Sequence, residues 1–437
     1  MSKKKHIYLP IEIKAREYVS NLLIVSKAID KGYRCYIGAK SSINRLASYK
    51  KEKDGIFFSK STLTEKDYIY YRNKFEYLTI LDQELGPALS FKEIKMGLHS
   101  SRDQIIPKYI DSYYVISENM KKLVKEIYPE IKEKIKLTGW PRIDLWKDFR
   151  YLSDDKIESI KKKYGKFILF SSDYSFTRKS NIYSFLKYLE EYNWSKDSTK
   201  YKFVKDQAYQ TYNEFKKNIN FFKKLDQLKL DYKIIIRPHP ADDRKHWTRL
   251  SKYFKNILVI YEGDITEWLY ASEGFFHRGC TTAVQAAIAN ISPVYLISDK
   301  KFIRETLTYE ISDKINSIDE FLQYFKEKKF LSKDNQLKLK EYILLEEDIS
   351  SCSLIIKDFE SFDVNVSDPQ KLGLLNFIKE FIFKIKNLIR KKGSMKIYKL
   401  GDGINFKETE ELFFKIRKIK DFKLKKIFDN CLEIEKI

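Results

Sequence analysis

Two stretches of the chain place polar side chains directly after an apolar run, where they could bind a phosphate. The first is the segment 233–240, in which three isoleucines precede Arg237 and His239. Pro238 and Pro240 stop a strand from continuing beyond this point. An arginine and a histidine that leave a strand at a stiff turn can donate hydrogen bonds to phosphate oxygens. The segment therefore predicts an anion site at the carboxyl end of a buried strand.

The second stretch is the segment 277–284, which follows the apolar pair Phe275–Phe276. Its candidate binding residues are His277, Gly279, Cys280, Thr281 and Thr282. The two threonines open a helix of small apolar residues, and the free N–H groups at a helix start bind anions. A single histidine beside a strand could act as a general base, but it is more often a hydrogen-bonding residue. We therefore assign His277 to binding.

Two carboxylates, Asp82 and Glu84, follow the apolar segment 78–81. In a doubly wound sheet the ligand crevice lies at the carboxyl ends of the strands, so these acids are expected to face it. Two carboxylates that share a site can separate in pKa, and one can then work as acid or base. The alternative is that they form a solvated turn or hold Arg102 or Arg142.

Four motifs together resemble those of the bacterial surface carbohydrate biosynthesis proteins. They are Leu-Asp-Gln-Glu-Leu-Gly at 81–86, Thr-Gly-Trp-Pro-Arg-Ile-Asp at 138–144, and the segments 233–240 and 277–284. That family is related to the β-Kdo transferases of capsule and O-antigen assembly, which have a GT-B fold and use a CMP-activated sugar. The resemblance runs from about Ile7 to about Ile297.

The resemblance implies a CMP-sugar donor, a glycan or lipid-linked glycan acceptor, and catalysis by Asp82 or Glu84. It also implies that an acid after the strand at 257–259, here Glu262, contacts the nucleoside through its ribose hydroxyls. Asp264 is expected instead to cap the next helix. The chain departs from the family at Gln83, where a second acid is expected, and at Trp140, where asparagine is expected. The first departure leaves open which acid is catalytic.

A length of 437 residues with 43% hydrophobic content predicts two domains plus an extension. The opening pattern of strand, helix and strand over residues 6–38 is a βαβ unit, which implies a parallel sheet. We expect an α/β, GT-B-like fold with two Rossmann-like domains whose parallel sheets face a cleft. The N-terminal acceptor-side domain is expected at 1–150 and the nucleotide-sugar domain at 151–350. A helical, basic, amphipathic extension is expected at 351–437.

Several other polar residues are expected near a domain junction. Ser171, Ser172 and Asp173 follow the first strand of the second half, where they could line the cleft or only satisfy a turn. Arg142 and Asp144 could lie at the same junction, although Asp144 could equally cap its own short helix. The segment 293–297 is expected to be the last strand of the second sheet.

Composition and cysteine spacing limit the class of protein. The formal net charge is +23, but lysines alternate with acids along the whole chain and no nucleic-acid recognition motif occurs. We therefore expect anionic sugar or membrane partners rather than nucleic acid. The cysteines, Cys35, Cys280, Cys352 and Cys431, lack metal-site spacing. We expect a cytoplasmic protein with neither a bound metal nor a cofactor.

The segment 374–392 predicts an amphipathic helix with a cationic end. It could lie on an anionic cytoplasmic leaflet or pack on the enzyme. Two other functions remain open: a CDP-glycerol-type glycerophosphotransferase, and a non-catalytic scaffold that binds nucleotide sugar or membrane. The sequence leaves open the donor sugar, the acceptor and linkage, and whether the reaction retains or inverts configuration.

Overall fold

The computed structural model divides the chain into two compact units. Unit 1 comprises 1–86, 91–152 and 340–437, and unit 2 comprises 87–90 and 153–339. The structure describes residues 3–50, 52–83, 91–98, 106–172, 174–179, 181–191, 199–239, 242–297, 306–327, 329–346, 348–368, 400 and 403–437. Each unit is built on its own sheet.

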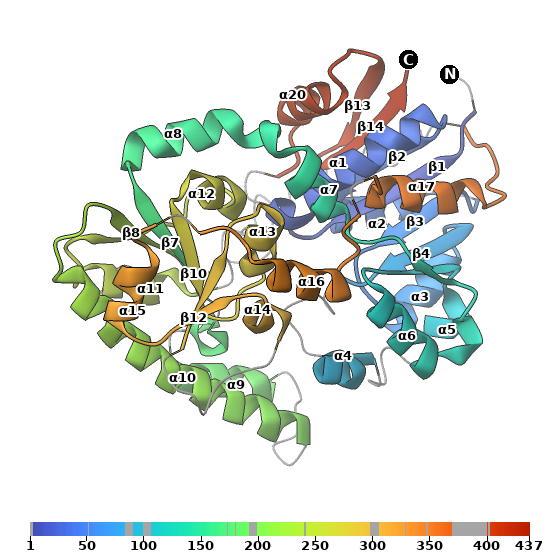
Figure 1. Ribbon diagram of the computed structural model, residues 1–437. Helices are drawn as coiled ribbons and strands as arrows, with labels where there is room; N and C mark the ends of the chain where they lie inside the picture. The colour runs from blue at the N-terminus through green and yellow to red at the C-terminus, as the bar shows by residue number, and fades with distance from the viewer. Residues whose placement is uncertain are drawn as a thin grey trace, which may run out of the picture. The chain divides into compact units, whose positions relative to one another are not determined.

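Unit 1 contains an eight-stranded sheet in the order β13-β14-β2-β1-β3-β4-β5-β6. The strands are β1 His6–Ile11, β2 Arg34–Ala39, β3 Ile56–Ser59, β4 Tyr77–Leu81, β5 Ser112–Val115, β6 Ile135–Leu137, β13 Phe422–Phe428 and β14 Cys431–Lys436. Strands β1 to β6 pair in parallel, whereas β14 pairs antiparallel with both β13 and β2. Figure 1 shows this hairpin, in red, beside the blue strand β2.

Helices cover the sheet of unit 1 because its strands are apolar on both faces. The helices are α1 Lys14–Asp30, α2 Lys40–Tyr49, α3 Glu65–Arg72, α4 Phe91–Leu98, α5 Ile106–Tyr109, α6 Glu118–Ile127, α7 Pro141–Asp148, α17 Ser351–Glu360 and α20 Phe406–Arg417. Helix α1 contacts α7, α17 and α20, so the segment after unit 2 completes the cover on that face. Helix α16, Lys333–Tyr342, spans the boundary between the units.

Unit 2 contains a six-stranded, all-parallel sheet in the order β12-β11-β10-β7-β8-β9. Its strands are β7 Phe167–Ser171, β8 Lys233–Arg237, β9 Ile257–Val259, β10 Gly274–His277, β11 Pro293–Leu296 and β12 Asp313–Ile315. Its helices are α8 Asp154–Tyr164, α9 Ile182–Glu191, α10 Thr199–Asp226, α11 Arg244–Ser251, α12 Ile265–Ala271, α13 Thr282–Ile288, α14 Leu307–Glu310 and α15 Ile318–Tyr324.

The two faces of the unit 2 sheet carry separate apolar cores. Phe170, Ile236 and Phe276 pack with residues of α9, α10, α11 and α15. Leu169 and Ile235, one residue earlier on their strands, pack with α8, α12 and α13. Alternate residues of a strand point to opposite faces, so a continuous apolar run serves both cores.

The α/β prediction of two Rossmann-like domains built on parallel sheets is confirmed. Two details of the prediction are wrong. Strand β12, Asp313–Ile315, lies beyond β11, so the segment 293–297 is not the last strand of the sheet. Residues 422–436 form a hairpin where only helices were expected. Lysine and apolar residues alternate along β13, and Asn430 adopts the positive φ of 59° that a tight turn requires.

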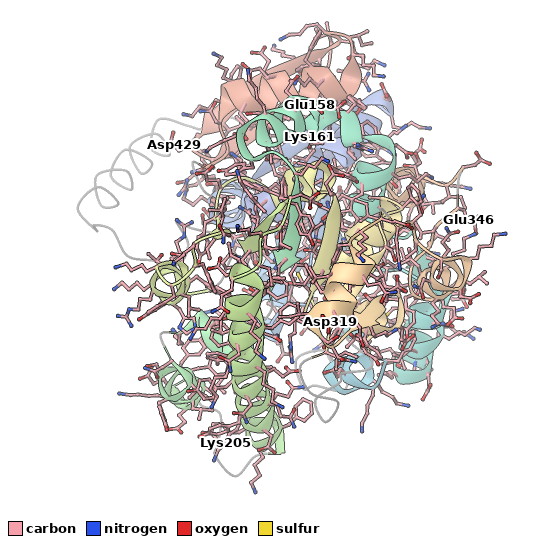
Figure 2. The ribbon with its side chains drawn as sticks, turned by 60° about the vertical axis from the view of Figure 1, so that its left-hand side comes forward. Glu158, Lys161, Lys205, Asp319, Glu346 and Asp429 are labelled. Atoms are coloured by element: carbon pink, nitrogen blue, oxygen red, sulfur yellow. The ribbon has the colours of Figure 1, made fainter. Side chains whose placement is uncertain are left out.

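Charged side chains are spread over the surface of the chain (Figure 2). The exposed pair Glu158 and Lys161 on α8, for example, are 2.9 Å apart. In the part of the chain that the structure describes, every helix is too short or too polar to cross a bilayer. The amphipathic segment 374–392 lies outside the described residues.

Candidate functional site

Three polar residues form one row across the central strands of unit 2. Ser171 at the end of β7 is paired in register with Arg237 of β8 on one side and with His277 of β10 on the other. All three side chains lie on the face of the sheet that packs against α8, α12 and α13, and all are buried. The polar residues predicted at the carboxyl edge thus lie side by side at the ends of these three strands.

The guanidinium of Arg237 binds the loop that follows β9. Its Nη1 donates to the carbonyl oxygens of Ile260, at 3.3 Å, and of Glu262, while Nη2 donates to the carbonyl of Gly263 at 2.8 Å. Burial disfavours its charge and lowers its pKa to about 10, although Asp264 and Glu267 act in the opposite direction. Through these contacts Arg237 positions the loop after β9. The sequence patterns did not predict this role.

Replacing Arg237 by methionine is expected to destabilise unit 2, because the carbonyls of Ile260 and Gly263 lose this donor, whereas that of Glu262 still accepts from Trp268 Nε1 at 2.8 Å. A buried acceptor left unsatisfied costs about 1–3 kcal/mol. The measurement is urea unfolding followed by hydrogen exchange of β8 and β9. Lys233→Met, at the exposed amino end of the same strand, is the matched control. Equal stability of the two variants would contradict the positioning role.

His239 lies in a loop that Asp242 organises. The carboxylate of Asp242 accepts hydrogen bonds from the backbone N–H of His239 at 3.2 Å, from Thr177 Oγ1 at 2.7 Å and from Trp247 Nε1 at 2.8 Å. Asp242 is buried, whereas His239 is partly exposed. The loop is thus fixed through its backbone, and His239 keeps part of its surface exposed.

His277 is fully buried and neutral. Burial, together with the charge of Arg278, lowers its pKa to about 3. Ser312 Oγ donates to the carbonyl of Thr308 at 2.6 Å, so it accepts from the N–H at His277 Nε2, 2.9 Å away. His277 Nδ1 has no hydrogen-bond partner among the described residues. An imidazole in this state is a poor general base. The binding role assigned to His277 stays a prediction.

The loop between β10 and α13 carries the remaining candidates of the second stretch. Cys280 Sγ lies 3.2 Å from both Ser171 Oγ and Thr282 Oγ1. Gly279 has a positive φ of 71°, and a Cβ there would meet no atom of the described residues within 4 Å. Thr281 precedes α13 without a side-chain capping bond. The loop is therefore anchored through Cys280 and open around Gly279.

Other predicted residues of unit 2 do not add a side chain to this row. The side chain of Glu262 is 70% exposed and lies 3.6 Å from Lys163. Asp264 caps α12, as expected, by accepting from the N–H of Thr266 at 2.8 Å. Ser172 is fully buried, with no partner for its Oγ in the described part of the chain. Asp173 lies outside the described residues.

In unit 1, Asp82 follows β4 and is buried, with 6% of its surface exposed. The backbone N–H of its neighbour Gln83 donates to the carbonyl of Lys60 at 2.9 Å. This places Asp82 at the carboxyl edge of the sheet, beside the residue that follows β3. Glu84 lies outside the described residues.

Sequence reasoning missed a network of ion pairs at the same edge. Lys60 lies 3.0 Å from Glu12 and 3.1 Å from Glu17, and Lys40 lies 2.8 Å from Glu12. Glu17 also accepts the backbone N–H groups of Glu12 and Ile13. Glu12, Lys40 and Lys60 each directly follow a strand, which is the signal that singled out Asp82.

Burial and charge act differently on the two glutamates. Burial opposes ionisation of Glu12, but the hydrogen bond from Lys40 and the charge of Lys60 outweigh it and lower its pKa to about 2. Burial raises the pKa of Glu17 above its usual value despite Lys60. Both lysines are engaged by carboxylates, so the turn after β1 offers little to a phosphate.

The side chain of Arg142 stacks on two tryptophans. Its guanidinium carbon lies 4.9 Å from the ring centre of Trp140 and 4.6 Å from that of Trp146. Asp144 caps α17 rather than its own helix, because its carboxylate accepts from Ser350 Oγ and from the N–H groups of the next two residues at 2.8–3.0 Å. The side chains of both residues therefore bind other residues of unit 1.

No group of three or more His, Cys, Asp or Glu side chains is placed to hold a metal ion among the described residues. The four cysteines, all of them among the described residues, are buried and form no disulfide bond. Burial raises the pKa of the thiols of Cys35 and Cys352.

No protein-family model matches the chain, and no curated protein matches it. Solved structures that resemble it share about a tenth of their sequence with it. The wall teichoic acid polymerase TagF is 12% identical, with 82% of this chain and 90% of that chain covered and a TM-score of 0.40. MnaA of S. aureus in complex with UDP is 12% identical, with 89% and 99% covered and a TM-score of 0.42. A putative UDP-N-acetylglucosamine 2-epimerase from Listeria monocytogenes is 12% identical, with 84% and 100% covered and a TM-score of 0.45.

Proposed function

We propose that the chain is a glycosyltransferase of bacterial surface polysaccharide biosynthesis that uses a CMP-activated donor, with Kdo or a related 3-deoxy acid sugar as the group transferred. The donor nucleotide binds at the carboxyl edge of the unit 2 sheet, and unit 1 carries the acceptor and the base. The choice of CMP and of the sugar rests on the motif resemblance. The assignment of the donor to the carboxyl edge of the unit 2 sheet rests on the geometry of the strand ends there.

The observation that carries the proposal is the row of Ser171, Arg237 and His277 with the loops that follow it. In parallel α/β sheets, ligands bind outside the carboxyl ends of the strands. His239 is fixed through its backbone and partly exposed, and the loop at Gly279 leaves open space. A partly exposed histidine and an open glycine turn suit a phosphate group, which needs donors and close backbone approach.

The charges at the carboxyl edge of the unit 1 sheet suit the binding of the acceptor. Both lysines at the turn after β1 are held by carboxylates, so this edge suits a neutral hydroxyl better than a phosphate. In the proposed step, the acceptor hydroxyl gives its proton to the carboxylate of Asp82 or Glu84. The acceptor oxygen bonds to the anomeric carbon as the bond from that carbon to the phosphate oxygen breaks, and CMP leaves with the electron pair.

Calorimetry with CMP, CDP and UDP tests the donor assignment. CMP is expected to bind most tightly, and His239→Ala is expected to weaken CMP binding by roughly 1.5–3 kcal/mol, the usual value of a hydrogen bond to a charged group. Lys245→Ala, an exposed cation on the following helix, is the control and should bind CMP normally. Tighter binding of CDP would favour the glycerophosphotransferase, and equal CMP binding by the wild type and His239→Ala would remove the phosphate role of His239.

A further inference from the structure

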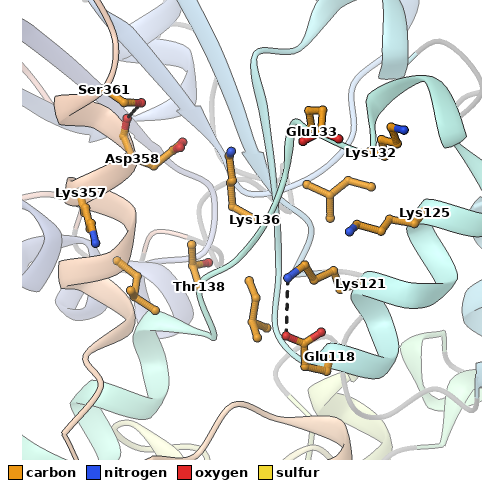
Figure 3. A pocket seen from close by; sticks show the side chains of 13 residues that line it. Glu118, Lys121, Lys125, Lys132, Glu133, Lys136, Thr138, Lys357, Asp358 and Ser361 are labelled. Carbon is orange, nitrogen blue, oxygen red and sulfur yellow. Dashed lines mark hydrogen bonds and ion pairs between the residues drawn. The ribbon is translucent and has the colours of Figure 1, made fainter.

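A basic groove lies at the edge of the unit 1 sheet, away from the residues discussed so far (Figure 3). Its volume is about 570 Å³, and α6, the edge strand β6 and α17 line it. The charged residues of the lining are Glu118, Lys121, Lys125, Lys132, Glu133, Lys136, Lys357 and Asp358. In Figure 3, Lys121 and Lys125 reach from α6 toward β6, and Lys357 stands on the opposite helix.

The five lysines of the groove outnumber its three acids, Glu118, Glu133 and Asp358, so the lining has a formal net charge of +2. Lys121 pairs with Glu118 at 3.5 Å. The carboxylate of Asp358 accepts hydrogen bonds from Ser112 Oγ at 2.6 Å and from the Tyr114 hydroxyl at 2.7 Å. The other four lysines make no ion pair within the described part of the chain. Four ammonium groups around one concave surface attract an anion even at physiological ionic strength, where screening acts over about 8 Å.

The groove reaches the same edge of the sheet as the candidate base. Thr138, which lines it, directly follows β6, and Asp82 directly follows β4. Only β5 separates the two strands, and neighbouring strands lie about 4.8 Å apart, so the lateral distance is roughly 10 Å. A chain lying along β6 could therefore present its end near Asp82.

We infer that this groove binds an extended glycan that carries carboxylates, and that it holds the growing acceptor chain; the second statement rests on the proposed function. Lysine ammonium groups bind anions as point charges without demanding one geometry, which suits a flexible chain. Among the described residues that line the groove, none has an aromatic side chain. Sites for single-stranded nucleic acid typically add aromatic platforms for base stacking, so the groove favours the glycan.

The test measures binding of a labelled oligogalacturonate by fluorescence anisotropy, with no nucleotide present. The test variant is Lys136→Glu/Lys357→Glu, which reverses two exposed charges on opposite sides of the groove. The control is Lys122→Glu/Lys162→Glu, which reverses two exposed charges outside it and changes the net charge equally. The test variant loses two exposed ion pairs between its lysines and the carboxylates of the glycan. It should therefore bind the oligogalacturonate about tenfold more weakly than the wild type, while the control stays within about twofold.

Three outcomes would overturn the inference: no binding of the oligogalacturonate by the wild type, equal weakening in both variants, or tighter binding of a single-stranded oligonucleotide of equal charge. Neutral maltohexaose is expected not to bind. The experiment needs neither donor nor turnover, so failure of the CMP assignment would leave its result unchanged. Conversely, if the wild type binds CMP normally but does not bind the oligogalacturonate, the inference about the groove fails and the CMP assignment stands.

Discussion

Replacing Asp82 by asparagine is expected to lower turnover by roughly a hundredfold or more, the usual scale for loss of a general base. Asparagine keeps the size of the side chain and much of its hydrogen bonding but cannot take a proton. Asp82 is buried at the carboxyl edge of the unit 1 sheet, next to the backbone that Lys60 anchors. The measurement is steady-state turnover with a CMP-sugar donor and a glycan acceptor.

CMP binding should be unchanged in Asp82→Asn, because the nucleotide is assigned to the other unit. Glu84→Gln is the companion variant, since the sequence leaves open which acid is the base. If both variants turn over normally while folding as the wild type does, these acids are structural. Asp173 and Glu262 would then be the next candidates.

Replacing Glu435 by alanine is expected to cost roughly 3–5 kcal/mol of unit 1 stability, because it removes the carboxylate that offsets the buried charge of Arg34. Arg34 is fully buried, and its Nε and Nη2 donate to one carboxylate oxygen of Glu435 at 3.0 Å and 2.7 Å. Urea unfolding with hydrogen exchange of the β2 amides measures the loss. The double variant Arg34→Met/Glu435→Leu should recover most of it, since removing both charges removes the cost of burying them.

The same pair gives the protein a pH dependence of known sign. Burial opposes ionisation of Glu435, but the hydrogen bond and charge of Arg34 outweigh it and hold its pKa below the ordinary value of a glutamate. The stabilisation is therefore complete above that ordinary value and is lost as the pH falls through the folded-state pKa. As the pH falls through this range, unit 1 of the wild type should lose stability, whereas Arg34→Met/Glu435→Leu, which lacks the titrating carboxyl, should lose less.

The sequence predicted the central strands because their apolar runs are long and uninterrupted. A polar residue after a strand also marks the start of α6, where the Ser117 side chain accepts from the N–H of Met120. Two short edge strands that contain charged residues gave no such signal: β6 has three residues with Lys136 in the middle, and β12 begins with Asp313 and Lys314. Their pairing depends on neighbours that only the folded sheet supplies.

The positions of the candidate site residues were more predictable than the directions of their side chains. Arg237 lies at a strand end, as expected, yet it turns toward carbonyl groups more than twenty residues later in the chain. Asp144 caps a helix more than two hundred residues away. Such partners depend on tertiary structure, so local spacing cannot reveal them. Glu12, Lys40 and Lys60 could have been found by applying the strand-end argument to every strand of unit 1.

The hairpin of β13 and β14 affects how the chain folds while it is being synthesised. Strand β14 pairs with β2, but almost four hundred residues separate them, and all of residues 153–339 lie in between. A nascent chain emerges amino end first, so unit 2 can fold while the outer edge of β2 is still unpaired. An open strand edge can pair with other chains. Unit 2 should therefore mature first on the ribosome, and chaperone protection of β2 should matter until residues 431–436 have emerged.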